Sequence, residues 1–109
     1  MPNQPLTEFR ATRAWARERI RELAADTANV RWGQHARERM VERSITDMDV
    51  LKVLRNGHIE TDPVRSDKGD GWKVKVVKTH SAGREIGVVT VILDRGFLRL
   101  VTIEWEDCQ

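Results

Sequence analysis

Apolar positions along the chain follow two different periods. Through residue 56 they recur every three or four residues, which is typical of helices that bury one face. From residue 58 onward they alternate with polar positions or form short β-branched runs, which is typical of strands. This change of period predicts an α+β fold in which two or three N-terminal helices pack on a mostly antiparallel sheet of about four strands.

The first helix is expected over residues 8–25, where good helix formers follow Thr7. Four residues on one face of this helix are expected to face the core: Phe9, Ala16, Ile20 and Leu23. Beside that face runs a set that we call the arginine strip: Arg10, Arg13, Arg17 and Arg21. Because four buried guanidiniums would each need a buried partner, the strip is expected to stay exposed.

Two further helices are expected over residues 34–43 and 47–56, after a short extended piece at 30–32. The last helix has the clearest start. Thr46 and Asp49 have the spacing of a capping box, while Ile45 and Val50 occupy the positions of a hydrophobic staple. Gly57 is predicted to end this helix in a left-handed conformation.

The second half of the chain predicts strands over residues 58–61, 72–78, 85–93 and 97–105. The third of these is apolar on both faces, so we expect it in the centre of the sheet. Asp94-Arg95-Gly96 is expected to join it to the last strand as a hairpin, with Gly96 in a left-handed position. The alternation along the last strand leaves open which face of the sheet meets the helices.

The length of 109 residues, with 39% hydrophobic and 33% charged, predicts one globular domain over residues 1–109 with frayed ends at 1–6 and 106–109. No apolar run reaches the roughly 18 residues that cross a bilayer, and no secretory signal pattern is present, so we expect a cytoplasmic protein without a membrane partner. The one cysteine, Cys108, excludes an internal disulfide and a cysteine-based metal site.

A net charge of +2 and a pI near 9.0 permit a polyanionic partner without requiring one. The arginine strip has two interpretations. It is either solvated helix surface, eased by Glu18 and Glu22, or a contact surface for RNA or an acidic protein. In the second interpretation, Arg13 and Arg17 are candidate substrate-binding residues.

The candidate catalytic residues lie on the helix expected over 34–43. A spacing of four places His35, Arg39 and Arg43 on one slowly turning stripe. Histidine transfers protons near neutral pH, while arginine binds phosphate oxygens and stabilises charge developing on phosphorus. Because RNA carries its own nucleophile, the 2′-hydroxyl, this set suits metal-independent cleavage of a phosphodiester. The same residues also fit a surface salt-bridge lattice in which His35 only hydrogen-bonds at the helix start.

Three further candidates for substrate binding lie in the second half. Lys73 and Lys75 share a strand face, which is either a phosphate track or a wet edge that opposes aggregation. Arg84 lies in a loop with His80, where both can reach a substrate. The three histidines are dispersed, with no carboxylate cluster beside them, so neither a metal nor another cofactor is expected.

One run of residues resembles a known bacterial family, the domain of unknown function 4258. The matching residues are His35-Ala-x-x-Arg39-Met-x-x-Arg43-x-Ile45-Thr46-x-x-x-Val50, Gly57-x-Ile59, Trp72-Lys73-Val74 and Val101-Thr102-Ile103. The resemblance covers about residues 30–105, and His35, Arg39 and Arg43 stand at the family's motif positions. Gly33 departs from the pattern, since the family commonly has a Ser or Thr cap there. Members occur as small proteins and as modules of toxin-like and mobile-element proteins.

The order of helices followed by a sheet is also similar to RelE-type ribonuclease toxins, so the resemblance implies RNA cleavage. The favoured hypothesis is a metal-independent endoribonuclease-like domain that acts as a toxin of a toxin–antitoxin or mobile-element system. RNA and an acidic cognate antitoxin are its expected partners. The alternative is a non-catalytic module that docks protein or nucleic acid through a sheet edge or the arginine strip.

Overall fold

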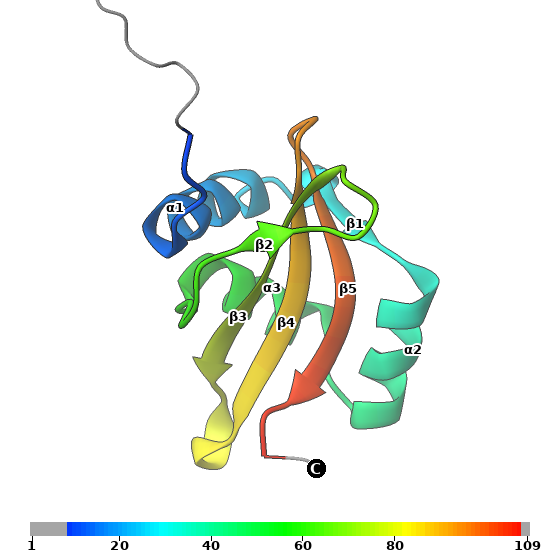
Figure 1. The fold of residues 1–109 in the computed structure, drawn as a ribbon. Coiled ribbons are helices and arrows are strands. Elements are labelled where there is room, and N and C mark those ends of the chain that lie inside the picture. Colours follow the sequence, from blue (N-terminus) through cyan, green and yellow to red (C-terminus); the bar gives the residue numbers. More distant parts are fainter. Residues whose placement is uncertain (1–8, 108–109) are drawn as a thin grey trace, which may run out of the picture.

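Five strands form one sheet in the order β1-β5-β4-β3-β2 (Figure 1). This computed structural model describes residues 9–107. Within that range the elements are α1 (Arg13–Ala24), η1 (Thr27–Asn29), β1 (Val30–Trp32), α2 (Gln34–Arg43), α3 (Asp47–Asn56), β2 (Val64–Arg65), β3 (Gly71–Thr79), η2 (Ser81–Gly83), β4 (Glu85–Leu93) and β5 (Leu98–Trp105). The expected α+β fold is confirmed, with five strands instead of about four.

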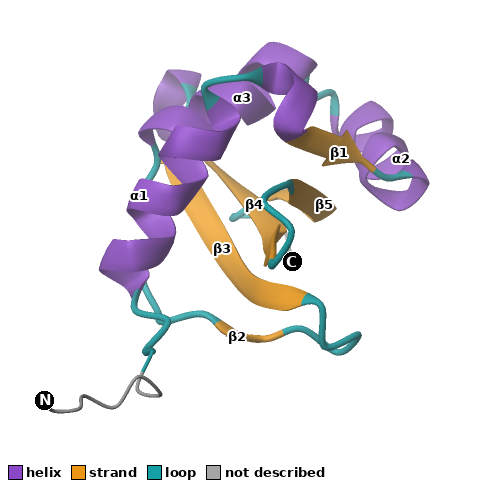
Figure 2. Cartoon of the chain, turned by 90° about the horizontal axis from the view of Figure 1, so that it is seen from above, coloured by secondary structure: helices purple, strands orange, loops and turns teal. Residues whose placement is uncertain are grey.

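Neighbouring strands are antiparallel except for β1 and β5, which pair in parallel. The α-helices of the described chain gather on one face of the sheet (Figure 2). There α3 packs on β3 and β4, α1 packs on α3, and α2 packs along β5. The opposite face has no helix among residues 9–107, and we call it the open face. No helix in that range is long and apolar enough to cross a membrane.

Buried residues of β5 show which face of the sheet meets the helices. Leu98, Leu100 and Ile103 are all buried in the core. Their spacing changes from two to three because the register with β4 shifts, so that Val101 is an extra residue between paired positions. This β-bulge keeps apolar side chains on the helix side in both halves of the strand.

The first helix begins later than predicted. Its N-cap is Thr12, whose hydroxyl accepts a hydrogen bond from the Trp15 backbone N–H at 3.1 Å. Phe9 lies before the helix, is 55% exposed and packs edge-on against Trp15, so its assignment to the buried helix face was wrong. The other three predicted members of that face are buried: Ala16, Ile20 and Leu23. The predicted start at Glu8 lies outside the described residues.

The next two helices have the predicted bounds, and the capping box of α3 is present. The Thr46 hydroxyl accepts from the Asp49 N–H at 3.1 Å, and the Asp49 carboxylate accepts from the Thr46 N–H at 2.9 Å. Ile45 and Val50 are both buried in the core. Local capping chemistry therefore fixes where α3 starts.

Gly57 ends α3 as predicted, but the left-handed conformation predicted for it was wrong. Its backbone is extended, with φ −79° and ψ −179°. A Cβ atom at this position would lie 2.6 Å from the Val53 carbonyl oxygen and 2.7 Å from the Val77 carbonyl oxygen. Glycine is required here because the end of α3 approaches β3 closely, and not because the helix ends in a left-handed turn.

The predicted strand over residues 58–61 was also wrong, because only an isolated bridge joins His58 to Val77 there. The side chain of Arg13 donates to the Glu60 carbonyl at 2.7 Å and to the Asp62 carboxylate at 3.2 Å. These bonds hold residues 60–62 against the start of α1. The short strand β2 follows this segment.

The remaining strand predictions are confirmed. The strand β4 matches its predicted bounds and lies between β3 and β5, as expected of a strand that is apolar on both faces. Gly96 has a φ of +97°, the left-handed conformation predicted for the hairpin. Glu106, which was expected to fray, donates from its backbone N–H to the Glu85 carbonyl at 2.8 Å.

Candidate functional site

The predicted catalytic stripe runs along α2, but its three side chains have different surroundings. His35 is exposed in the first turn. Arg39 is 27% exposed and pairs with Glu42 at 2.8 Å. Arg43 is half-buried and donates to the Ile103 carbonyl at 3.3 Å. Because a helix rises about 1.5 Å per residue, His35 and Arg43 are separated by about 12 Å along the axis. The stripe therefore does not converge on one point.

Arg43 lies where the end of α2 meets the end of β5. Its guanidinium binds the Ile103 carbonyl, and its own carbonyl accepts from the indole Nε1–H of Trp105 at 2.9 Å. The short strand β1 pairs only with residues 98–100 of β5, so the Ile103 carbonyl receives no hydrogen bond from β1. Arg43 therefore ties α2 to β5 and fixes the position of Trp105.

The indole of Trp105 connects this helix end to the hairpin between β3 and β4. The His80 ring meets it edge-on, with ring centroids 5.5 Å apart. The Arg84 guanidinium lies over it, 4.0 Å from the ring centroid. Across the hairpin, the His80 backbone N–H donates to the Arg84 carbonyl at 2.5 Å. An imidazole and a guanidinium are thus held against one indole.

Asp49 orients the imidazole. Its Oδ1 atom lies 3.0 Å from Nε2 of His80, while its Oδ2 atom accepts from the Thr46 N–H. Burial raises the pKa of Asp49, but hydrogen bonds from Thr46 and His80 outweigh it, so the pKa is lowered overall. We call Arg43, Asp49, His80, Arg84 and Trp105 the Trp105 cluster.

The charge of Asp49 decides the tautomer of His80. An ionised carboxylate only accepts hydrogen bonds, so Nε2 of His80 must carry the ring proton that it donates. In the neutral ring, Nδ1 then holds the lone pair. The His80 side chain is 34% exposed. The cluster therefore presents an oriented proton acceptor on a partly exposed ring.

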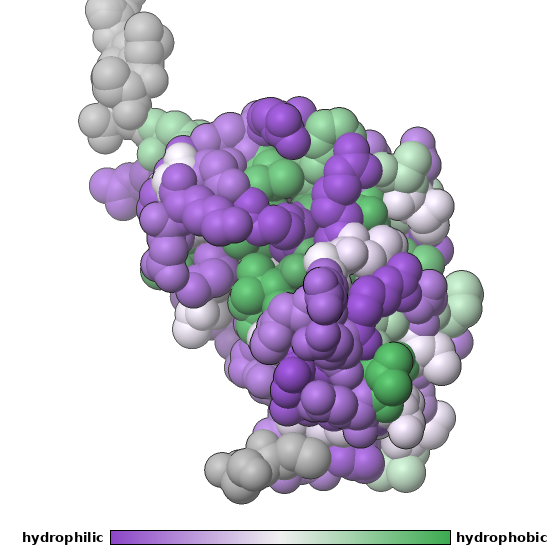
Figure 3. Space-filling view, turned by 90° about the vertical axis from the view of Figure 1, so that its right-hand side faces the viewer, coloured by the Kyte–Doolittle hydropathy of each residue, from purple (hydrophilic) through white to green (hydrophobic). Residues whose placement is uncertain are grey.

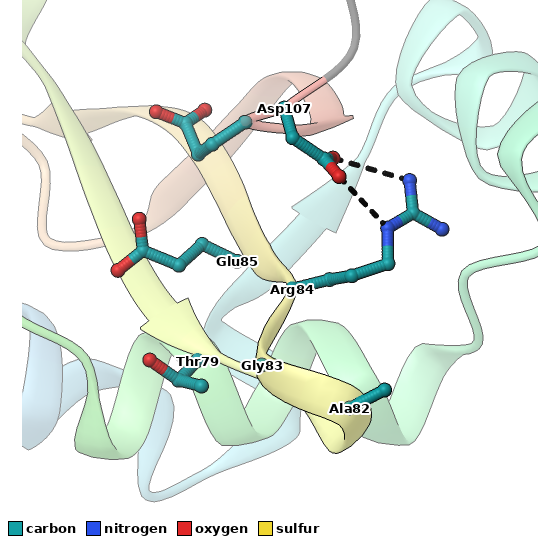
Figure 4. A pocket seen from close by; sticks show the side chains of 7 residues that line it. Thr79, Ala82, Gly83, Arg84, Glu85 and Asp107 are labelled. Atoms are coloured by element: carbon teal, nitrogen blue, oxygen red, sulfur yellow. Dashed lines mark hydrogen bonds and ion pairs between the residues drawn. The ribbon is translucent and has the colours of Figure 1, made fainter.

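A hollow of about 450 Å³ lies beside this hairpin (Figure 4). Its lining residues are Thr79, Ala82, Gly83, Arg84, Glu85, Glu106 and Asp107. Arg84 donates from Nε and Nη2 to the Asp107 carboxylate at 3.2 Å each, which lowers the pKa of Asp107. This volume lies in the range of small-ligand sites. Among residues 9–107, no group of three or more His, Cys, Asp or Glu side chains can hold a metal ion.

The two predicted lysines of β3 have separate surroundings. Lys75 pairs with Glu106 at 2.8 Å and with Glu104 at 3.6 Å. The hydrogen bond to Glu106 is the main reason why the pKa of Lys75 is raised. Lys75 therefore braces a wall of the hollow through Glu106. Lys73 points to the open face and lines a different hollow.

The arginine strip is exposed as expected, but its members differ. Arg13 donates from its backbone and from Nε to Asp62, at 3.0 Å and 3.2 Å, and these bonds lower the pKa of Asp62. Arg17 and Arg21 are exposed on α1, whereas Arg10 precedes the helix. Arg13 is thus engaged within the molecule, while a partner for Arg17 stays a prediction.

Sequence reasoning missed the pairing of Asp49 with His80. The two residues are 31 positions apart. The local pattern gives Asp49 the role of a helix cap and His80 the role of a loop residue, and both descriptions are correct. No spacing rule connects a cap with a hairpin, so only the packing of α3 beside β3 brings them together.

Comparison with known proteins identifies a family. No curated protein and no solved structure matches the chain. The expected similarity to RelE-type ribonuclease toxins therefore gains no support from known proteins. The family model that matches is described as "Domain of unknown function (DUF4258)" and covers residues 32–105, more than half of the chain. The chain is therefore a member of the DUF4258 family.

Proposed function

We propose that this domain cleaves RNA without a metal ion, with His80 as the general acid/base and Arg84 as the cation beside the scissile phosphate. The observation that carries the proposal is the bond between His80 and Asp49, 3.0 Å long. The carboxylate fixes one ring nitrogen and leaves Nδ1 to take a proton. A histidine oriented by a carboxylate is a recurrent arrangement for proton transfer near neutral pH.

The reaction uses the nucleophile that RNA itself carries. Nδ1 of His80 takes the proton of the 2′-hydroxyl, the bond between phosphorus and O2′ forms, and the bond between phosphorus and O5′ breaks. The protonated His80, or water, then supplies a proton to the departing O5′. The products are a 2′,3′-cyclic phosphate and a 5′-hydroxyl end. DNA lacks the 2′-hydroxyl and is not a substrate.

Arg84 stabilises the negative charge that develops on the phosphoryl oxygens. Its guanidinium stacks on Trp105 at 4.0 Å, and Asp107 binds one side of it. These contacts hold the planar fork in one orientation, so less side-chain entropy is lost when phosphate binds. Arg43 acts through Trp105 in this proposal, as a positioning residue.

The stripe on α2 gives a competing assignment within the same function. There His35 is the acid/base, with Arg39 and Arg43 as phosphate binders. The Trp105 cluster supports the proposal better because its imidazole has an orienting carboxylate and a neighbouring guanidinium. Both histidines are therefore tested together.

The test is cleavage of labelled single-stranded RNA under single-turnover conditions in excess EDTA. The proteins are the wild type and the variants His80→Ala, His35→Ala and His58→Ala. His58 is the matched control, since its side chain is 52% exposed and its ion-pair partner among residues 9–107 is Glu60. We expect the wild type to produce cyclic phosphate ends and to leave DNA intact. The His80→Ala rate constant should fall about 100-fold or more, and the His58→Ala rate constant less than twofold.

Each outcome decides something. Circular dichroism and thermal unfolding first establish that the variants are folded. Full activity in His80→Ala together with lost activity in His35→Ala would move the acid/base to α2. A wild type that cleaves no RNA would overturn the enzymatic proposal. A toxin role additionally requires that expression arrests growth and that the inactive variant does not.

The second candidate function is a non-catalytic module that binds RNA or an acidic protein. It is favoured by Arg17 and Arg21, which are exposed on α1 and form no ion pair with any of residues 9–107. In that case the bond between His80 and Asp49 only ties the hairpin to α3. Tight binding of RNA or of an acidic protein without any cleavage would support this reading.

A further inference from the structure

We infer that the open face carries a binding track for the phosphates of single-stranded RNA, formed by Arg31, Lys73, Arg95 and Arg99. We call these residues the outer cation row. The choice of RNA as the ligand rests on the proposed function. The row lies apart from the Trp105 cluster, because six residues of β5 at about 3.3 Å each separate Arg99 from Trp105 by about 20 Å.

The strand register aligns three of the four cations. Lys73 pairs with Val91, Val91 pairs with Arg99, and Arg99 pairs with Arg31. Directly paired residues share a face of the sheet, so these side chains form one line across β3, β4, β5 and β1. With strands about 4.8 Å apart, the line is about 14 Å long.

The line lies on the open face because the residues flanking it point the other way. Val30 and Leu98 precede Arg31 and Arg99 in their strands, and both are buried in the core. Successive side chains of a strand alternate between its faces. The two arginines are therefore directed away from the helices.

Arg99 lies between two adjoining hollows of the surface. One, of about 500 Å³, is lined by Arg31, Asp70, Leu93, Arg95 and Arg99. The other, of about 230 Å³, is lined by residues that include Lys73, Val91, Arg99 and Val101. Figure 3 views the molecule from the right-hand side of Figure 1 and shows mostly hydrophilic surface with smaller hydrophobic patches within it. The two hollows share Arg99 in their linings, and each also contains a carboxylate, Asp70 in the larger and Asp67 in the smaller.

The charges of this row are mostly uncompensated. Arg99 pairs with Asp70 at 2.5 Å, but Arg31, Lys73 and Arg95 form no ion pair with any of residues 9–107. Arg31 and Arg99 are paired positions of the parallel strands β1 and β5, and both line the larger hollow with Asp70. Asp70 offsets one of these two positive charges. A phosphate bound in the hollow would offset the other.

Phe97 holds two of the arginines in position. The Arg31 guanidinium lies 4.1 Å from the centre of its ring, and that of Arg95 lies 5.9 Å away. Arg31 also donates to the Ala28 carbonyl at 2.7 Å. The forks are thus oriented before an anion arrives, which favours bidentate binding of phosphate.

A single strand fits this track better than a duplex. The row is short, and the partly exposed Val101, which lines the smaller hollow, offers apolar contact to exposed bases and riboses, which a duplex keeps stacked inside. Because the row is remote from His80, we expect it to control how tightly RNA binds and not the rate of the chemical step.

The test is fluorescence anisotropy with a labelled single-stranded RNA of about 12 nucleotides at several salt concentrations. The triple variant Arg31→Gln/Lys73→Gln/Arg95→Gln is compared with Arg10→Gln/Arg17→Gln/Arg21→Gln, which makes the same change of charge on the rival RNA-binding surface of the second candidate function, the arginine strip. For single strands each phosphate contact contributes about 0.7 to the slope of log affinity against log salt. We expect the first variant to lower the slope by about 2 units and the second to leave it nearly unchanged.

A second variant is predicted to gain affinity, which a misfolded protein would not do. Asp70→Asn removes the carboxylate that pairs with Arg99, so it should tighten RNA binding and steepen the salt dependence. Equal loss of affinity in both triple variants, or no gain in Asp70→Asn, would overturn the inference. So would poly-glutamate competing as strongly as RNA of equal charge, since the ligand would then be an acidic protein.

The two proposals fail separately. If the wild type binds through the row but never cleaves, the row stands and the enzymatic proposal falls. If the wild type cleaves RNA and the row variant binds it as tightly as the wild type does, the enzyme stands and the row falls. At saturating RNA, the row variant should cleave at the wild-type rate.

Discussion

Replacing Asp49 tests whether one carboxylate serves both the fold and the proposed chemistry. Asp49→Ala removes the hydrogen bond to the Thr46 N–H and the bond to His80. The first is a helix cap, worth about 1 kcal/mol. The second is a partly exposed hydrogen bond, worth about 0.5–1.5 kcal/mol. The free energy of unfolding should therefore fall by roughly 2 kcal/mol.

Thr46→Ala is the matched comparison. It removes the hydroxyl that accepts from the Asp49 N–H but leaves the bond between Asp49 and His80 in place. Thr46→Ala should lower the free energy of unfolding by about 1 kcal/mol. In a domain of this size, 1 kcal/mol lowers the Tm by about 4 °C, so we expect losses of about 4 °C for Thr46→Ala and 8 °C for Asp49→Ala. Only Asp49→Ala should also slow RNA cleavage.

The pH dependence gives a further check. The pKa of Asp49 is lowered in the folded state, so the unfolded chain binds a proton more readily. The stability that Asp49 contributes is then present above its unfolded pKa of roughly 3.9 and is lost as the pH falls through the lower folded value. Urea unfolding at pH 7 and at acidic pH should show the deficit of Asp49→Ala shrinking with acidity. A deficit that stays constant, or equal slowing of cleavage in both variants, would refute the reasoning.

Two other predictions concern close packing and charge. Gly57→Ala should lower the free energy of unfolding, measured with urea, by about 1–3 kcal/mol. The reason is that the new Cβ would lie within 2.7 Å of two backbone carbonyl oxygens. Gly33→Ala is the control, because its Cβ would make an ordinary contact at 3.7 Å. The pKa of Asp70 is held at about 2, first by its hydrogen bond from Arg99 and then by that from Ser66, so Arg99→Gln should raise it in a carboxyl NMR titration. An unchanged Asp70 titration would contradict that assignment.

Local chemistry explains why much of the fold could be predicted. The capping box at Thr46 places the start of α3, and the apolar run of residues 85–93 identifies β4 as a central strand. The segment 58–61 has the composition of a strand, but Arg13 binds the Glu60 carbonyl from 47 residues away. Such a tertiary contact leaves no periodic signal, so the pattern alone assigned the wrong structure.

In the candidate site too, local sequence identifies single residues, whereas tertiary contacts decide which of them meet. Arg43 could be singled out by its spacing on a helical stripe with His35 and Arg39, and Arg84 by its residue type and its place in a loop. That both meet the Trp105 region depends on hydrogen bonds and stacking across 60 and 21 residues of chain, which no local spacing encodes. His80 gained its partner in the same way, from a helix cap on a different element.

The bulge in β5 shows how a single residue sorts side chains between the two surfaces. A strict alternation would place Arg99, Val101 and Trp105 on one face, opposite Leu98. The extra residue at Val101 changes the phase, so Trp105 joins Leu98 on the helix side while Arg99 points to the open face. The pairing of Ile86 with Trp105 at the far end of the strand agrees, since Ile86 lies in the core. Without this bulge the indole would leave the Trp105 cluster, and both proposed sites depend on that phase.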